Sequence, residues 1–389
     1  MTEPANTSLG NAGATDEVRR ARAYLLRVAE PPAPALAALV EACGPVEAAA
    51  LVRAGRAPRP VVDETSARRS QDHADEDLTA ARQAGARLVV PEDDEWPAWQ
   101  LLSLDQAGTR GLHWARAPLA LWARGPARLS DLVEQAVSIV GARAATGYGE
   151  HVAADFAYGL ATAGWTVASG AAYGIDGAAH RGALAAEGAT IAVLGCGIDV
   201  GYPAGHRNLL DRIAETGLVL SEYAPGTPPA RHRFLVRNRL IAALSAGTVV
   251  VEAGARSGAR NTAACAAALG RELMAVPGPI TSAQSTGCHE LLRSGLAIPV
   301  SSVEEVLESI GPLGESLATH PITPSRPTDG LGPEALRVHE ALAKRTARSA
   351  ERIAVDSGVP LNRVRALLPE LELTGLARRD EDGWRQAAS

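Results

Sequence analysis

Three glycine-rich turns in the sequence have residues that could hold phosphate groups. They span residues 140–149 (VGARAATGYG), 169–180 (SGAAYGIDGAAH) and 252–263 (EAGARSGARNTA). Each turn follows a short apolar run and precedes a helical pattern, so backbone N–H groups and a helix N-terminus would face one point. The guanidinium, hydroxyl and glycine positions that could take part are Gly141, Arg143, Ser169, Gly170, Gly174, Ser257, Gly258 and Thr262.

A fourth segment, residues 231–245 (RHRFLVRNRLIAALS), combines arginines with an aromatic ring. It places four arginines in nine residues, contains no acid, and holds one of the two phenylalanines of the chain. Guanidinium groups bind phosphates, and a flat ring offers a stacking platform for a base, which suits single-stranded nucleic acid. The candidates from this segment are Arg233, Phe234, Arg237, Asn238 and Arg239. Phe234 could instead belong to the core, since the opposite face of the predicted helix is apolar.

Other reactive side chains near these turns have structural interpretations. Asp176 is suited to cap the helix that contains His180, and we interpret His180 as a structural residue because no nucleophile lies at a suitable spacing. Glu252 stands at a strand end and could act as a general base. The first turn lacks the GxGxxG pattern and no acid follows where a ribose hydroxyl would need one, so we expect no dinucleotide cofactor.

Composition limits the possible partners. The 389 residues carry a net charge of −6, so any positive surface must be local. Of the 38 basic residues only Lys344 is a lysine. The four cysteines have no metal-ligand or paired spacing, and we expect them to be reduced thiols of the core, with no bound metal. Without a signal peptide or an apolar stretch of membrane length, we expect a cytoplasmic protein that does not bind membranes.

The central part of the chain alternates between strand-like and helical patterns. The apolar runs 137–140, 166–169, 190–194, 218–221, 248–252, 273–276 and 297–300 predict seven strands, with helices between them. Continuous apolar, β-branched runs are typical of strands buried on both faces. We therefore predict an α/β fold with an extended, Rossmann-like, doubly wound and mostly parallel sheet, whose ligand lies at the carboxyl ends of the strands.

Breaks in this pattern suggest further modules. Residues 15–56 predict a small helical module of the SAM or helix-hairpin-helix kind, followed by a charged linker up to about residue 77. The central domain covers 77–310, and its entry segment 88–125 holds four tryptophans that we expect to pack on the sheet. A proline-rich linker covers 311–332. Three helical patterns and a hairpin in 333–389 predict a winged helix-turn-helix module.

Taken together, the motifs resemble the DNA-processing protein A (DprA/Smf) family. The resemblance rests on VGAR, SGAAYGIDGAAH, TIAVLGCGIDVGYP, RFLVRNRLIAALS and VVEAGARSGARNTA, and it covers about residues 88–308. It implies a homodimer that binds single-stranded DNA without catalysis and loads RecA recombinase during natural transformation. It also implies that Gly141, Arg143, Ser169, Gly170 and residues 237–239 lie in the DNA pocket. After Tyr202 the expected basic residue is missing, and Arg207 is the candidate to replace it.

Two other functions remain open from the sequence. The same type of fold occurs in nucleotide phosphoribohydrolases, which use glycine-rich turns and a strand-end glutamate such as Glu252. However, the PGGxGT-type turn of such enzymes is replaced here by GARSGARNTA. A sequence-specific regulator acting through the winged helix would leave the large central domain unexplained.

Overall fold

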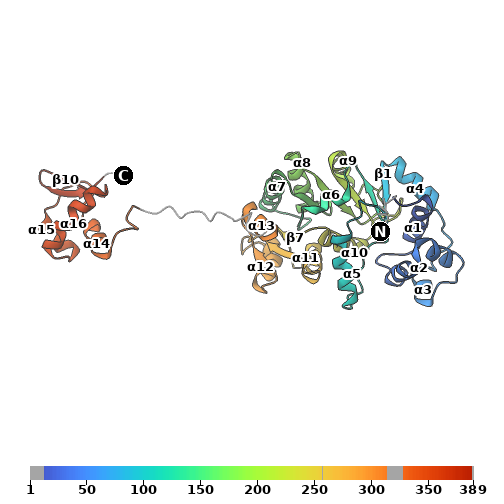
Figure 1. The fold of residues 1–389 in the computed structure, drawn as a ribbon. Helices are drawn as coiled ribbons and strands as arrows, with labels where there is room; N and C mark the ends of the chain where they lie inside the picture. Colours follow the sequence, from blue (N-terminus) through green and yellow to red (C-terminus); the bar gives the residue numbers. More distant parts are fainter. Residues whose placement is uncertain (1–12, 256, 313–326, 388–389) are drawn as a thin grey trace, which may run out of the picture. The chain divides into compact units, whose positions relative to one another are not determined.

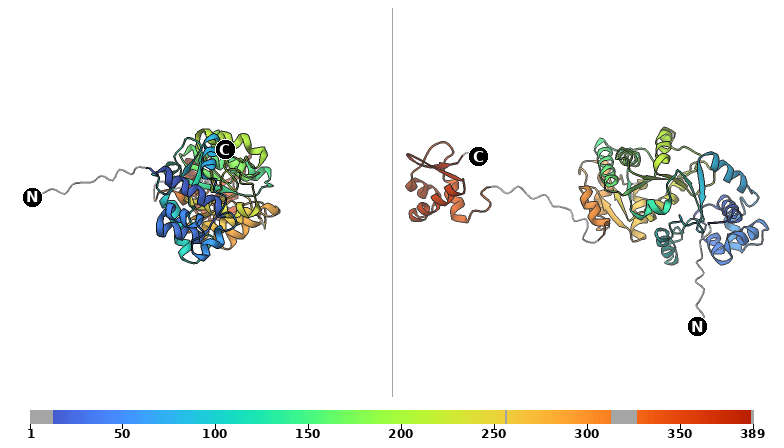
Figure 2. Two further views of the ribbon diagram at one scale, coloured as in Figure 1. Left: turned by 90° about the vertical axis from the view of Figure 1, so that its right-hand side faces the viewer. Right: turned by 45° about the horizontal axis from the view of Figure 1, so that its top comes forward.

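The computed structural model describes residues 13–255, 257–312 and 327–387, and the chain divides into two compact units (Figure 1). The larger unit, up to Ala318, contains a nine-stranded sheet with helices on both faces (Figures 1 and 2). The smaller unit begins at Thr319 and contains three helices and a two-stranded hairpin among its described residues.

The large sheet has the order β1-β2-β6-β5-β4-β3-β7-β8-β9. The strands β3 to β9 are parallel, whereas β1 and β2 are antiparallel to their neighbours at one edge. The bounds are β1 Ala86–Val89, β2 Leu121–Arg124, β3 Ala136–Val140, β4 Thr166–Ser169, β5 Thr190–Leu194, β6 Leu218–Ser221, β7 Gly247–Val250, β8 Glu272–Ala275 and β9 Ile298–Pro299. Because chain order reverses at β3, the switch point of this sheet lies between β3 and β7.

Helices cover both faces of the sheet and form separate cores with it. One face is covered by α5 (Ala98–Thr109), α10 (Arg231–Ala243), α11 (Gly258–Ala268) and α12 (Thr286–Arg293). The other face is covered by α7 (Gly147–Thr162), α8 (Ile175–Ala185), α9 (Arg207–Thr216) and α13 (Val303–Ile310). The short helix α6 (Leu129–Glu134) precedes β3. The predicted Rossmann-like, doubly wound and mostly parallel sheet is confirmed.

The sequence located the parallel strands but not the antiparallel edge. The bounds of β4, β5 and β6 agree with the predicted ones, and the other four predicted strands differ by one or two residues. The two edge strands β1 and β2 were not predicted. They lie in the segment with four tryptophans, where Trp122 of β2 is fully buried while Trp99 is 78% exposed. β1 pairs only with β2, and both runs lie outside the strand–helix alternation that identified the parallel strands.

The N-terminal helices are continuous with the central unit. They are α1 (Asp16–Val28), α2 (Pro34–Arg53), α3 (Arg59–Thr65) and α4 (Ala74–Gln83), and their apolar side chains share a core with β1, β2 and α9. The charged stretch 56–77, predicted to be a linker, instead contains α3 and the start of α4. Its charges are used in ion pairs, including Arg53 with Asp72 and Arg68 with Glu30.

Helix α2 corrects two further expectations. By length and composition it is the one candidate membrane span among the described residues, although the sequence was expected to contain none. Gly44, with a φ of 81°, interrupts it, so neither half is long enough to cross a membrane. Cys43 at the same break is exposed, so it is not a core thiol, whereas the other three cysteines are buried.

The smaller unit has the predicted winged-helix pattern. Its helices are α14 (Pro333–Glu340), α15 (Ala350–Ser357) and α16 (Leu361–Leu373), followed by the hairpin β10 (Ala377–Asp380) and β11 (Gly383–Gln386). Val338, Ile353, Val364 and Leu368 form the centre of its own core. On the helix that follows the turn, Arg363 pairs with Glu334 and Arg365 pairs with Glu351, so both of its arginines already have acidic partners.

Candidate nucleic-acid interface

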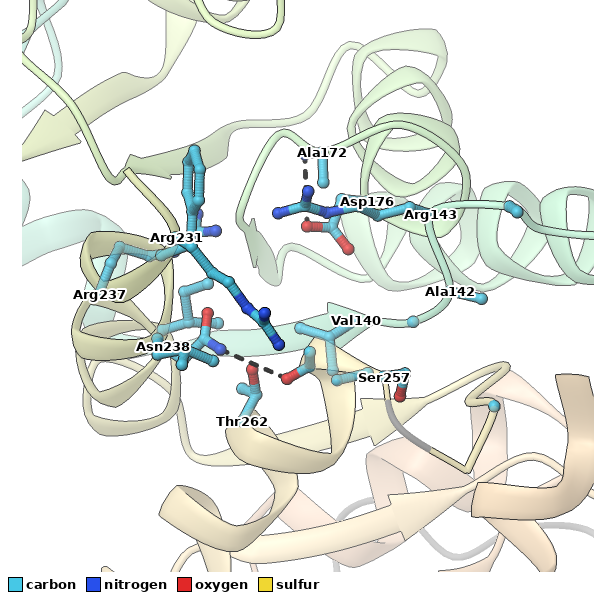
Figure 3. A pocket seen from close by; sticks show the side chains of 18 of the residues that line it. Val140, Ala142, Arg143, Ala172, Asp176, Arg231, Arg237, Asn238, Ser257 and Thr262 are labelled. Atoms are coloured by element: carbon cyan, nitrogen blue, oxygen red, sulfur yellow. Dashed lines mark hydrogen bonds between the residues drawn. The ribbon is translucent and has the colours of Figure 1, made fainter. Parts of the chain in front are cut away.

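A cavity of about 940 Å³ lies at the switch point of the sheet (Figure 3). Its walls come from the loop after β3, the first turns of α8 and α10, the loop after β7, and the start of α11. Parallel strands bring these loops to one edge, which is where ligands bind in open α/β sheets. Its lining includes the predicted residues Gly141, Arg143, Phe234, Arg237, Asn238, Ser257, Gly258 and Thr262, and also Tyr202 and Arg231.

Two arginines of the cavity are exposed and have no acidic partner among the described residues. Arg143 follows β3 and Arg231 begins α10, and neither donates a hydrogen bond to a described group. Figure 3 shows their side chains reaching into the cavity from opposite sides. A guanidinium group without an acidic partner keeps all its donors for a ligand, so these two side chains are suited to bind phosphate oxygens.

An aromatic pair lies beside these arginines. The rings of Phe234 and Tyr202 stack with their centroids 5.3 Å apart and at an angle of 27°. The guanidinium carbon of Arg143 lies 5.2 Å from the Phe234 ring centroid, within cation–π range. Phe234 is half-buried and belongs to none of the hydrophobic cores, which favours the stacking interpretation over the core one. Tyr202 was not predicted to take part, because nothing local in the sequence pairs it with a ring 32 residues away.

Arg237 is a buried structural residue. Its side chain donates to the carbonyl oxygens of Gly170, at 2.8 Å, and of Val193, and only 4% of the residue is exposed. Burial lowers the pKa of Arg237 to about 10, against the attraction of the nearby Asp176 carboxylate, so it remains charged at neutral pH. Arg237 lines the cavity and is held to the protein through Nη1, whereas its Nε is buried without a hydrogen-bond partner among the described residues.

The amide nest predicted in the second glycine turn is occupied by a side chain of the protein itself. Asp176 accepts a hydrogen bond from the Ala172 N–H at 3.4 Å (Figure 3). Burial raises the pKa of Asp176, although Arg237 and the N–H groups of Ala172, Gly141 and Gly170 oppose this effect. A carboxyl group in the nest competes with a phosphate for the same donors. Asp176 is therefore not the helix cap, a position held by Gly174.

The glycines of these turns serve close packing. A Cβ at Gly141 would collide with Ile175, and one at Gly170 would collide with the Arg237 guanidinium. Gly174 has a φ of 74°, a conformation that favours glycine, and it approaches the carbonyl of Ala142. Ser169 is fully buried and donates to the Ile139 carbonyl at 2.7 Å, so its hydroxyl is not available to DNA. Among these four, only Gly141 lines the large cavity.

Three of the predicted arginines lie outside the cavity. Arg239 is 1% exposed and binds Glu222 through two hydrogen bonds of 2.8 and 2.7 Å, so it is a core ion pair. Arg233 binds Glu30 at 2.7 Å. Arg207 is exposed but lines a separate hollow near Arg124 and Asp211. Successive positions of a helix point in different directions, so the arginines of α10 lie in several different environments.

Residues at the start of α11 form the polar floor of the cavity. Asn238 donates to the side-chain oxygen of Asn261 at 3.0 Å and to the carbonyl of Gly258 at 3.4 Å. Ser257 is the N-cap residue of α11, and Thr262, in its second turn, is almost fully buried. The predicted residues Asn238, Ser257, Gly258 and Thr262 therefore lie together. Arg256, which belongs to the same turn, lies outside the described residues.

The residues that suggested enzyme chemistry have structural partners. Glu252 is 1% exposed, and its two oxygens accept hydrogen bonds from the backbone N–H and the hydroxyl of Thr146, at 2.9 and 2.6 Å. It thereby fixes the start of α7 and does not line the cavity. His180 is fully buried beside the hydroxyl of Thr190, and burial lowers its pKa to about 3. The described residues contain no group of three or more potential metal-binding His, Cys, Asp or Glu side chains.

Comparison with known families identifies the family of the chain. A model of "DNA recombination-mediator protein A" matches residues 87–311, and a "DprA winged helix domain" model matches residues 322–383. The chain belongs to the DNA recombination-mediator protein A family. The DNA processing protein DprA of Mycobacterium tuberculosis is 51% identical over 95% of both chains. Protein Smf of Escherichia coli is 37% identical over 74% of both chains.

A solved structure of the family shares the fold. DNA processing protein A of Streptococcus pneumoniae has a TM-score of 0.59 and 31% identity, and the match covers 76% of this chain and 96% of that one. The Helicobacter pylori family member, whose structure describes a single-stranded DNA binding mode, matches 49% of this chain and 86% of its own at 32% identity and a TM-score of 0.46. The family is one of DNA-processing recombination mediators, and the nucleotide phosphoribohydrolase alternative is not favoured.

Proposed function

We propose that this protein binds single-stranded DNA in the cavity at the switch point, without catalysing a reaction on it. The carrying observation is that Arg143 and Arg231, neither of which has an acidic partner in the described part of the chain, reach into one cavity beside the stacked rings of Phe234 and Tyr202. Guanidinium groups on phosphates and aromatic platforms under bases are the usual means of holding a single strand with little sequence preference.

Membership of a recombination-mediator family supports a role after DNA binding. We propose that the protein protects incoming single strands and delivers them to RecA recombinase in the cytoplasm, as in natural transformation. The site that we propose comprises Arg143, Arg231, Phe234, Tyr202 and Asn238, with Ser257, Gly258 and Thr262 on its floor.

A second copy of the chain is the partner that we propose for the far edge of the sheet. The edge strand β9 is two residues long, and Leu296 and Ile298 beside it are 58% and 40% exposed. Ile280, in the loop after β8, is 91% exposed. Apolar side chains at an open sheet edge favour pairing with another chain. Light scattering of Ile298→Glu against wild type tests this, and an unchanged mass would contradict it.

We propose a separate role for each part of the chain. We propose that DNA binding belongs to the central domain of residues 77–310, while the helical module of residues 15–56 supplies Glu30 as a partner for Arg233. The winged-helix module of residues 333–389, after the linker 311–332, has both arginines of α16 in ion pairs, so we assign DNA binding to the cavity and not to this helix.

Titration with labelled oligonucleotides tests the proposed function. We expect the protein to bind a single-stranded oligomer much more tightly than the corresponding duplex, with an affinity that falls steeply with salt. Release of free base from nucleoside monophosphates, measured in parallel, should stay at background. Equal affinity for duplex, or turnover of a nucleotide, would contradict the proposal.

A further inference from the structure

The side-chain amide of Asn238 has a fixed orientation on the floor of the cavity. Its nitrogen lies 3.4 Å from the carbonyl oxygen of Gly258 and 3.0 Å from the side-chain oxygen of Asn261. A backbone carbonyl can only accept hydrogen bonds, so the Asn238 nitrogen must face Gly258. The reversed amide would place two acceptors against each other, which excludes it.

This orientation leaves the Asn238 carbonyl oxygen as an acceptor that lines the cavity. Asn238 is only 6% exposed, yet it lines the cavity, and its oxygen accepts no hydrogen bond from a described residue. Because this oxygen has no partner among the described residues and is not one of the solvent-inaccessible side-chain atoms, a ligand in the cavity can reach it. A buried acceptor of this kind requires a donor from the ligand, because leaving it unpaired after the cavity fills would cost affinity.

A phosphate group cannot supply that donor. A phosphodiester carries a negative charge and only acceptor oxygens, so it would be repelled by the Asn238 oxygen and also by the Asp176 carboxyl group, which lines the same cavity. The free guanidinium groups of Arg143 and Arg231, which suit phosphates, come from the loop and helix start around the cavity. The groups that can donate hydrogen bonds to phosphates and the group that can accept one from a base thus lie in different parts of the same cavity.

We propose that the floor of the cavity takes one nucleobase, whose Watson–Crick N–H donates a hydrogen bond to the side-chain oxygen of Asn238. This inference rests on the proposed function and names how one base of the strand is held. The phosphates on either side of that base contact Arg143 and Arg231, and Phe234 lines the space between. Unstacked bases of single strands are commonly held in this way, by a ring and by hydrogen bonds to their Watson–Crick edge.

A chemically modified strand tests this on the wild-type protein. Thymine has one N–H donor, at N3, so an oligomer of about 15 thymidines offers no other donor from its bases. The same oligomer with every thymine methylated at N3 keeps the backbone charge and the stacking surface. We expect methylation to weaken binding about three- to tenfold, the usual effect of one hydrogen bond. Equal affinity for the two oligomers would overturn the proposal.

A variant separates the hydrogen bond from the added bulk of the methyl group. Asn238→Ala should bind the unmodified oligomer about three- to tenfold more weakly and should no longer distinguish it from the methylated one. Asn261→Ala is the matched control, since it removes a neighbour of Asn238 but leaves the Gly258 carbonyl to hold the amide. It should keep the discrimination of the wild type.

The possible outcomes are distinct. If Asn238→Ala discriminates against the methylated oligomer as strongly as wild type, the loss comes from bulk alone and the proposal fails. If Asn238→Ala does not fold, which circular dichroism would show, the affinities of the wild-type protein for the two oligomers still test the proposal. If wild type binds neither oligomer, the proposed function itself fails, and this differs from binding both equally, which refutes only the role of Asn238.

Discussion

Arg143 and Arg233 provide a test of which arginines hold DNA. Both lie close to an aromatic ring near the start of α10: the Arg143 guanidinium carbon is 5.2 Å from the Phe234 ring centroid, and that of Arg233 is 5.3 Å from the Tyr223 ring centroid. They differ in their partners, because Arg233 is bound to Glu30 at 2.7 Å whereas Arg143 has no acidic partner among the residues that the structure describes. We expect Arg143→Ala to weaken DNA binding and Arg233→Ala to leave it nearly unchanged.

The size of the effect follows from the exposure and charge of Arg143. A hydrogen bond to a charged group contributes about 1.5–3 kcal/mol, and an exposed residue falls at the lower end, so the affinity at low salt should drop about tenfold. Each phosphate neutralised on a single strand contributes about −0.7 to the slope of log K against log salt. The advantage of wild type over Arg143→Ala should therefore shrink by about 2.6-fold between 50 and 200 mM salt.

Fluorescence anisotropy with a labelled single strand, repeated across this salt range, measures both quantities. Thermal melting of both variants serves as the control, since Arg233→Ala removes the ion pair with Glu30 and should lower the melting temperature. The reasoning is refuted if Arg233→Ala weakens binding as much as Arg143→Ala, or if Arg143→Ala keeps the wild-type salt slope.

Three further substitutions probe other parts of the site and its support. Phe234→Ala should cost about 1–3 kcal/mol of single-strand affinity in the same assay while the melting temperature changes little; early melting with normal binding would make the ring structural. Glu222→Gln leaves Arg239 buried without a counter-charge and should cost about 3–5 kcal/mol in urea unfolding, with the salt slope of DNA binding unchanged. Burial favours the neutral form of Glu30, but hydrogen bonds from Arg233, Arg68 and His232 outweigh it and lower its pKa to about 2. The stability that Glu30 contributes should therefore be complete above about pH 5 and be lost between about pH 5 and 2. Unfolding of Glu30→Gln should lack this component, and an identical acid profile would contradict it.

The sequence alone predicted the elements whose formation depends on local pattern. Continuous apolar runs with β-branched residues located β4, β5 and β6 to the residue, because strands buried on both faces carry that signal within four or five positions. The alternation of strands and helices also located the glycine-rich turns. Because the strands are parallel, these turns must meet at one edge of the sheet. The winged helix also has a complete local pattern of three helices and a hairpin.

The choice of functional side chains depended on the tertiary structure. Among the four arginines of α10, Arg231 faces the cavity, Arg237 binds carbonyl groups at the strand ends, and Arg233 and Arg239 have acidic partners that lie 203 and 17 residues away. A local pattern cannot reveal an ion pair between segments so far apart.

The amide nest of the second glycine turn shows the same limit. The nest was predicted to bind phosphate, but the carboxyl group of Asp176 occupies it. This carboxyl group accepts a hydrogen bond from the N–H of Ala172, four residues earlier in the chain. Sequence spacing determines which backbone groups are brought together, because strand and helix geometry are local. Whether those groups are free for a ligand depends on which side chains fold back onto them, and burial and long-range charge pairing in the folded protein decide this.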